Sequence, residues 1–214
     1  MLENTYGVLE RKLHDRTKAW DRLIEFIAVD NYAPLFFQLN HKFEWFFEDS
    51  QLAKELIDVY DIDLLRSDYY DHLGEMYIEK LLNKSEVQLK GIYLTPMEVG
   101  KLMANVTIED TDKKINILDP AVGTGRLLMA AHKQAPKARL FGVDTDLRVL
   151  RIAYTNLAIH NIQGYLLHAD SLRHEIDIST KSGRENWHYA NNWYSQIDKL
   201  KVKSERIEPD LFTK

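Results

Sequence analysis

Short, mostly apolar runs alternate with amphipathic segments in the second half of the chain. The runs 115–118, 140–143 and 165–169 lead directly into Asp119, Asp144 and Asp170. The segments between them, 126–134 and roughly 147–161, carry apolar residues at helical spacing. This alternation predicts one half of a doubly wound parallel α/β sheet, in which ligands bind beyond the carboxyl ends of the strands. We therefore expect the three aspartates to lie near a ligand.

The first part of the chain, residues 1 to about 84, has the pattern of helices joined by short turns. Apolar side chains recur at helical spacing at Leu23, Phe26 and Ile27, and again from Leu52 to Tyr60. Pro34 is the one proline of this region, and glycine is nearly absent before Gly74. The pattern predicts two domains, a helical bundle over residues 1–90 and a sheet-containing domain over 91–214.

The helical region is dense in aromatic residues, and two interpretations are open. The residues are Trp20, Phe36, Phe37, Phe43, Trp45, Phe46 and Phe47. An exposed set would stack on the bases of a single-stranded nucleic acid. A buried set would form the core of the bundle, which is the commoner use of Phe and Trp and the interpretation we favour.

The segment that precedes the sheet predicts a helix start. Thr95 can cap a helix, Pro96 suits its first position, and Glu98 completes a capping box. An apolar face is then expected from Met97, Val99, Leu102 and Met103. Such a helix end also favours anions, although capping alone accounts for these residue types.

Composition narrows the functional classes. The formal net charge of −5 does not advertise a broadly basic nucleic-acid surface, so a partner or local patches would have to supply phosphate contacts. The absence of cysteine excludes thiolate metal sites and a cysteine nucleophile. No apolar run approaches the ~20 residues that span a bilayer, and the first residues do not resemble a secretory signal. We expect no membrane association and a cytoplasmic location.

The residues in and after the turn Gly123-Thr124-Gly125 indicate which nucleotide-type cofactor the chain would bind. A nicotinamide fingerprint needs a third glycine where Leu128 stands, and a P-loop needs a lysine where Arg126 stands. The remaining prediction is a tight turn that lets the backbone approach a ligand, with Asp144 accepting from ribose hydroxyls. Asp119 would accept from a cationic amino group and Asp170 from an adenine amino group. These three acceptors fit S-adenosylmethionine, although each aspartate alone could be a helix cap.

Five segments together resemble the N-6 adenine DNA methyltransferases, especially the modification subunits of type I restriction systems. They are Asp71–Tyr77, Gly91–Pro96, Leu118–Gly125, Gly142–Asp146 and His168–Leu172. The resemblance implies an N-terminal helical domain followed by a partial Rossmann-like S-adenosylmethionine-dependent methyltransferase sheet, and makes 91–214 the cofactor-binding domain. It implies a cofactor pocket, without metal, formed by Tyr93, Thr95, Asp119, Ala121, Gly123, Thr124, Gly125, Asp144, Thr145, Asp170 and Ser171. Thr145 would lie against the adenine.

The chain departs from this family at the catalytic motif, which is Asn, Asp or Ser followed by Pro-Pro and an aromatic residue. No Pro-Pro occurs here, and the segment Ala190–Tyr194 is the nearest candidate. Asn191 and Tyr194 would be its catalytic residues. The chain therefore resembles the front portion of a methyltransferase, with the catalytic half degraded or absent.

Three functions follow as hypotheses. The first is an adenine DNA methyltransferase of a restriction-modification system, which contacts DNA itself or through a separate recognition subunit. The second is an inactive cofactor-binding subunit that pairs with another chain or with its own copies. The third is a small-molecule methyltransferase, against which the Tyr93-Leu94-Thr95-Pro96 segment argues.

Overall fold

The computed structural model describes residues 1–30, 44–83, 85–87, 93–109, 114–177 and 179–182. Its first part is helical, as the sequence predicts. The helices are α1 (Leu2–Leu13), α2 (Arg16–Asp30), α4 (Glu44–Glu48), α5 (Ser50–Val59), α6 (Ile62–Ser67) and α7 (His72–Leu81). Aspartates begin three of them: Asp49, Asp61 and Asp71 each accept a hydrogen bond from a backbone N–H of the first turn.

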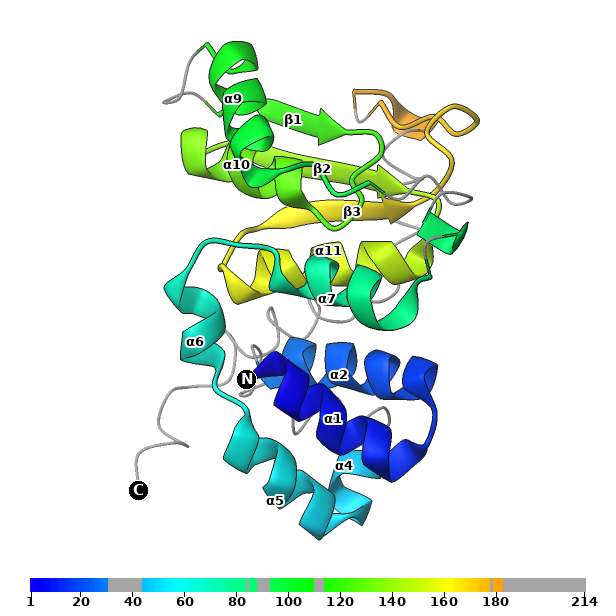
Figure 1. Cartoon of the computed structure of the whole chain (residues 1–214). Helices are drawn as coiled ribbons and strands as arrows, with labels where there is room; N and C mark the ends of the chain where they lie inside the picture. The colour runs from blue at the N-terminus through cyan, green and yellow to red at the C-terminus, as the bar shows by residue number, and fades with distance from the viewer. Residues whose placement is uncertain (31–43, 84, 88–92, 110–113, 178, 183–214) are drawn as a thin grey trace, which may run out of the picture.

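A three-stranded parallel sheet with the order β1-β2-β3 forms the second part (Figure 1). Its elements are α9 (Met97–Thr107), β1 (Asn116–Asp119), α10 (Arg126–Gln134), β2 (Arg139–Asp144), α11 (Leu147–Ile159) and β3 (Gly164–His168). Leu118, Phe141 and Tyr165 are paired across the sheet. The predicted strands are thus confirmed to within one or two residues at each end, and so is the mixed class of a helical region followed by a partial α/β sheet.

Helices α10 and α11 pack against one face of the sheet. The apolar core on this face includes Leu128 and Met129 of α10, Leu157 of α11, Leu140 of β2 and Leu166 of β3. Because the strands are parallel, Asp119 and Asp144 come to the same edge of the sheet. This edge positions the candidate site.

The helical region shares a hydrophobic core with α11. Val149, Ile152 and Ile159 of α11 belong to the same buried cluster as Trp20 and Leu73 of the helical region. Two polar contacts join the same parts: Arg148 Nε lies 3.4 Å from Asp21 Oδ1, and Arg66 Nε donates to the Ile159 carbonyl at 3.2 Å. Figure 1 shows α7 between α2 and α11. The domain boundary at residue 90 stays a prediction.

The aromatic residues of the helical region that the structure describes are core residues. Trp20 is fully buried, with its ring 5.6 Å from that of Tyr77, and Trp45 and Phe46 are half-buried against the same cluster. This confirms the core interpretation for these three residues. Phe36, Phe37, Phe43 and the side chain of Phe47 lie outside the described residues.

The start of α9 differs from the prediction. Pro96 is the N-cap, with φ −55° and ψ 139°, and no side chain caps the helix. The capping box of Thr95 and Glu98 is therefore wrong. Glu98 instead pairs with Lys101 at 3.5 Å.

The apolar face predicted for α9 is also wrong, except at Met97. Val99, Leu102 and Met103 are exposed, while Gly100 and Ala104 are buried against α10. A Cβ added at Gly100 would lie 3.4 Å from the Ala130 Cβ, so the helices approach each other through small residues. Close approach at these small residues turns the larger side chains outward.

No helix within the described ranges has the length and apolarity needed to cross a membrane.

Candidate cofactor site

A cavity of about 400 Å³ lies at the carboxyl ends of β1 and β2. Three segments line it: the stretch before α9, the turn after β1 and the turn after β2. The lining residues are Tyr93, Leu94, Thr95, Asp119, Ala121, Val122, Gly123, Thr124, Arg126, Leu127, Asp144, Thr145, Asp146 and Val149. The volume suits a small molecule.

The turn between β1 and α10 has the shape that its glycines predict. Gly123 and Gly125 adopt positive φ angles of 54° and 92°, a region that side-chain-bearing residues rarely occupy. A Cβ on Gly123 would meet no atom within 4 Å, whereas one on Gly125 would lie 3.4 Å from the Ala153 Cα of α11. Gly123 therefore leaves the backbone open toward the cavity, and Gly125 lets the turn before α10 approach Ala153 of α11 closely.

Asp144 ties this turn to the end of β2. Its Oδ2 accepts from the Gly123 N–H at 2.9 Å, and its Oδ1 accepts from the Asp146 N–H at 2.9 Å. Because a carboxylate offers about four acceptor positions, Asp144 retains capacity for a ligand hydroxyl.

Asp119 presents a carboxylate oxygen with no partner. Its Oδ1 accepts from the Ala121 N–H at 3.1 Å, while Oδ2 is buried and has no hydrogen bond among the described residues. Burial, with a smaller contribution from the charge of Asp144, raises the pKa of the Asp119 carboxyl. A buried polar atom without a partner is costly, so a cationic donor in the cavity would be favoured at this position.

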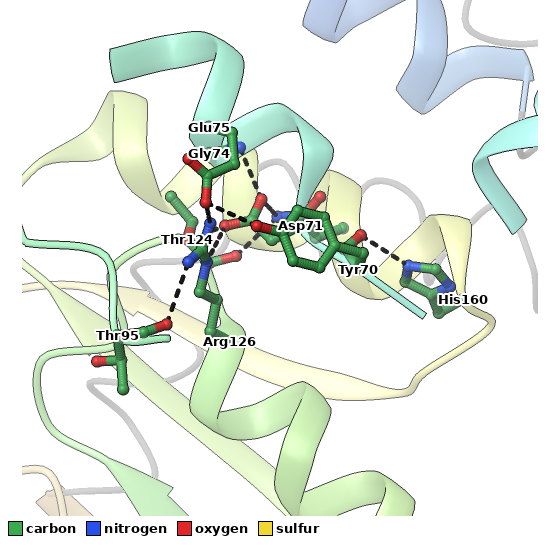
Figure 2. A network of polar contacts seen from close by, with 9 residues as sticks. Tyr70, Asp71, Gly74, Glu75, Thr95, Thr124, Arg126 and His160 are labelled. Carbon is green, nitrogen blue, oxygen red and sulfur yellow. Dashed lines mark hydrogen bonds and ion pairs between the residues drawn. The ribbon is translucent and has the colours of Figure 1, made fainter. Parts of the chain in front are cut away.

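A buried polar network lies behind the turn, and the sequence did not reveal it. Asp71, at the start of α7, accepts from Thr124, Arg126 and Asn156. Figure 2 shows the guanidinium of Arg126 close to Thr95 on one side and to Glu75 on the other. Asp71 is marked in the sequence by the family resemblance of Asp71–Tyr77 and by its cap spacing to Gly74, but its other contacts join residues far apart in the chain.

Eight of the predicted cofactor residues line the cavity together. They are Tyr93, Thr95, Asp119, Ala121, Gly123, Thr124, Asp144 and Thr145. Tyr93 is 74% exposed. The Thr145 carbonyl lies 3.0 Å from His168 Nε2 of β3. The structure thus brings the lead-in segment and both strand ends to one place.

Three predicted residues do not line the cavity. Gly125 faces α11, as described above. Asp170 accepts from the Leu172 N–H at 2.9 Å and lies 3.2 Å from Arg173 Nε, which makes it a local turn residue. Ser171 follows it in the same turn. Their contact with a cofactor stays a prediction, and Asn191 and Tyr194 lie outside the described residues.

Within the described part of the chain, no group of three or more His, Asp or Glu side chains could hold a metal ion.

Comparison with known proteins places this arrangement in a family context. The chain is 23% identical over 167 residues to the methylase subunit of the type I restriction enzyme MpnII of Mycoplasma pneumoniae, covering 67% of this chain and 31% of that protein. It is 26% identical over 173 residues to the MjaVII methylase subunit of Methanocaldococcus jannaschii, covering 78% of this chain and 26% of that protein. The chain therefore spans about a third or less of these relatives.

Among solved structures, a putative class I S-adenosylmethionine-dependent methyltransferase from Listeria monocytogenes is similar, with a TM-score of 0.48 and 18% identity over 80% of this chain and 54% of that one. The profile of the N-6 DNA methylases matches residues 68–210, about two thirds of the chain. This chain belongs to the N-6 DNA methylase family.

Proposed function

We propose that the cavity at the ends of β1 and β2 binds S-adenosylmethionine, the cofactor that membership of this family implies. The buried, unpartnered Oδ2 of Asp119 is the observation that carries the proposal. It offers an acceptor for the cationic amino group of the methionine moiety, which a dinucleotide or a nucleoside triphosphate lacks at this position.

Further residues have proposed roles around the bound cofactor, four of them in the cavity wall and two, Asp170 and Ser171, in the turn after β3. Asp144 accepts from the ribose hydroxyls with the acceptor positions that Gly123 and Asp146 leave free. Thr145 lies against the adenine, and Tyr93 and Thr95 form the wall opposite. Asp170 accepts from the adenine amino group, with Ser171 beside it.

The proposed reaction is methyl transfer to the N6 amino group of adenine in DNA. When bound, S-adenosylmethionine would supply a methyl group on its sulfonium, with the C–S bond broken and a neutral thioether left as the C–N bond to the adenine forms. The adenine nitrogen would release one proton to solvent. Asn191 would accept a hydrogen bond from this nitrogen, and Tyr194 would stack on the base after it leaves the duplex. The chemistry requires neither a covalent intermediate nor a metal.

A second candidate function is an inactive cofactor-binding subunit that pairs with another chain. The candidate catalytic segment favours this inactive function, because it has Asn192 and Trp193 at the positions that Pro-Pro would take in the family motif. Proline fixes φ near −65°, so its loss removes the constraint that holds the leading Asn in place.

The proposed partners are DNA and at least one further protein chain. With 28 Lys and Arg against 33 Asp and Glu, the net charge of −5 does not provide a broadly basic surface for phosphate contacts. A recognition subunit, a complementary methylase chain or a second copy of this chain would then supply much of the DNA contact. Since these functions belong to DNA metabolism, the proposed location is the cytoplasm.

Calorimetric titration with S-adenosylmethionine tests the cofactor proposal. We expect the parent chain to bind it and Asp144→Ala to weaken binding by about 1–3 kcal/mol, the usual effect of losing a charge-assisted hydrogen bond. Asp177→Ala is the matched control, because Asp177 is exposed and does not line the cavity. No binding by the parent would refute the proposal, and equal affinity of Asp144→Ala would refute the role of Asp144.

A further inference from the structure

We infer that Asp71 is a positioning residue of the cofactor pocket, which it controls from the helical region through Thr124 and Arg126. The inference rests on the proposed function, since it concerns the affinity of the same cavity for S-adenosylmethionine. Asp71 itself does not line the cavity, and it lies on α7 rather than on any element of the sheet.

Asp71 is fully buried and its two oxygens accept four hydrogen bonds. Oδ1 accepts from the Gly74 N–H at 2.6 Å and from Asn156 Nδ2 at 2.6 Å. Oδ2 accepts from the Thr124 hydroxyl at 2.5 Å and from Arg126 Nε at 2.8 Å. One carboxylate therefore joins α7, the glycine turn, α10 and α11. An asparagine could not replace it, because the amide offers only one acceptor oxygen.

Thr124 is held from both sides by this network. Its hydroxyl donates to Asp71, and its carbonyl accepts from Asn156 Nδ2 at 2.9 Å. Thr124 lies between the two glycines that shape the cavity, Gly123 and Gly125. Since glycines permit many backbone conformations, a fixed Thr124 restricts the turn to one of them. The hydroxyl is engaged by Asp71, so its effect on a ligand passes through the turn.

Arg126 extends the network to the other wall of the cavity. Its Nη1 donates to the Thr95 carbonyl at 3.1 Å, and its Nη2 donates to Glu75 Oε1 at 2.6 Å. Figure 2 shows the guanidinium between these two groups. Thr95 belongs to the lead-in segment, so one buried cation sets the distance between that segment and the turn after β1. Asp71 orients this cation.

The burial of this pair favours a positioning role over a purely stabilising one. The side chains of Arg126 and Asp71 are 6% and 0% exposed. Desolvation of such a pair offsets much of its attraction, so apolar side chains would stabilise the interface as well. Apolar side chains could not form the directional hydrogen bonds that connect α7 to two walls of the cavity.

The test measures the dissociation constant of S-adenosylmethionine by calorimetry, with the binding stoichiometry as a count of folded molecules. We expect Asp71→Asn to raise the dissociation constant by about tenfold or more, in the range of couplings through packed networks. Asp68→Asn is the matched control: this exposed carboxylate lies three residues earlier, contacts His72 and should leave the constant unchanged. A fall in stoichiometry or melting temperature with an unchanged constant would show a structural role only and overturn the inference.

A double-mutant cycle separates positioning by Thr124 from direct contact with the ligand. Thr124→Val removes the hydroxyl that donates to Asp71. We expect it to weaken binding alone but to add little in the Asp71→Asn background. Additive effects would mean that Thr124 acts independently of Asp71 and would overturn the inference. If Asp71→Asn does not fold, Asn156→Ala takes its place in the cycle. Asn156 does not line the cavity, and it donates to both Asp71 and Thr124.

Binding by the parent chain distinguishes a failure of the positioning role from a failure of the proposed function. If the parent binds S-adenosylmethionine and Asp71→Asn binds it equally well, the positioning role fails and the proposed function stands. If the parent does not bind, both fail.

Discussion

Asp119 and Asp144 end neighbouring strands of the sheet, and burial together with the nearby charge of Asp144 raises the pKa of the Asp119 carboxyl. The two carboxylates line one cavity with Asp146, whereas the one cation among the described lining residues, Arg126, is already paired with Asp71 and Glu75. A cation in the cavity would lower the mutual repulsion of the carboxylates. A sulfonium cofactor with an ammonium group has the matching charge.

This relationship predicts a pH dependence of cofactor binding. A cationic ligand binds the charged form of Asp119, so affinity should fall as the pH is lowered through the raised pKa of this group. Titration calorimetry over a pH series would measure the effect. Asp119→Asn should bind more weakly at neutral pH and lose that part of the pH dependence. A pH profile unchanged by the substitution would contradict the role of Asp119.

The same shift makes a prediction for the free protein, with the opposite sign. Because the pKa of Asp119 is higher in the folded state than in the unfolded state, its contribution to stability is fully present below the unfolded pKa. That contribution is lost as the pH rises through the folded-state pKa. We therefore compare the free energy of unfolding of Asp119→Asn with that of the parent at each pH. The difference in favour of the variant should be larger at neutral pH than at acidic pH. Chemical unfolding at both pH values measures this difference.

The two glycines of the turn should respond differently to alanine. Both have positive φ, which costs an ordinary residue about 1–2 kcal/mol. Gly125→Ala also forces a Cβ to within 3.4 Å of the Ala153 Cα, so it should be the more destabilising. Gly123→Ala meets no neighbour and should instead weaken cofactor binding, because its Cβ enters the cavity wall. Thermal unfolding and calorimetry on both variants would test this, and equal losses in both properties would argue against it.

Aromatic residues of the helical region should behave as core residues in proportion to their burial. Trp20 is fully buried, so Trp20→Ala should lower the free energy of unfolding by about 3–5 kcal/mol. Trp45 is half-buried beneath the Arg22 guanidinium, so Trp45→Ala should cost less. Urea unfolding measures both. A Trp45→Ala variant with unchanged stability but impaired nucleic-acid binding would restore the stacking interpretation.

The parts of the fold that the sequence predicts are those with local signals. The strands are short apolar runs, and the turn between Asp119 and Arg126 is marked by two glycines at positions that need positive φ. Both kinds of signal reside in the segment itself. The helices of the first part follow from apolar spacing, and the structure adds Asp49 and Asp61 as caps of two of them.

The parts that the sequence does not predict depend on contacts between distant residues. Asp71 meets Thr124, Arg126 and Asn156 at separations of 53, 55 and 85 residues. Nothing in the local pattern distinguishes such an aspartate from an ordinary helix cap. The predicted orientation of α9 is wrong for a related reason. Gly100 and Ala104 face α10 because their small size lets the two helices approach each other. Amphipathicity identifies large apolar residues and misses a close approach through small ones.

The shared core of α11 and the helical region predicts one cooperative unfolding transition. Ile152 is fully buried in that core, so Ile152→Ala should cost about 2–5 kcal/mol. It should shift the signals of the helices and of the sheet together. Thermal unfolding followed by far-ultraviolet circular dichroism and by tryptophan fluorescence would show this. Two separate transitions, with only one moved by Ile152→Ala, would support independent domains divided near residue 90.

The last prediction concerns catalytic competence. On the proposed assignment of Ala190–Tyr194 as the catalytic motif, Asn192 and Trp193 take the place of the prolines that would fix Asn191 against the transferred methyl group. A displacement of about 1 Å in such a site reduces the rate on the order of a hundredfold. We therefore expect this chain alone to bind S-adenosylmethionine but to transfer little or no methyl group to DNA. Incubation with tritiated cofactor and adenine-containing DNA measures the transfer. Robust methylation that Asn191→Ala abolishes would contradict the prediction and would make the segment from Asn191 to Tyr194 a working catalytic motif.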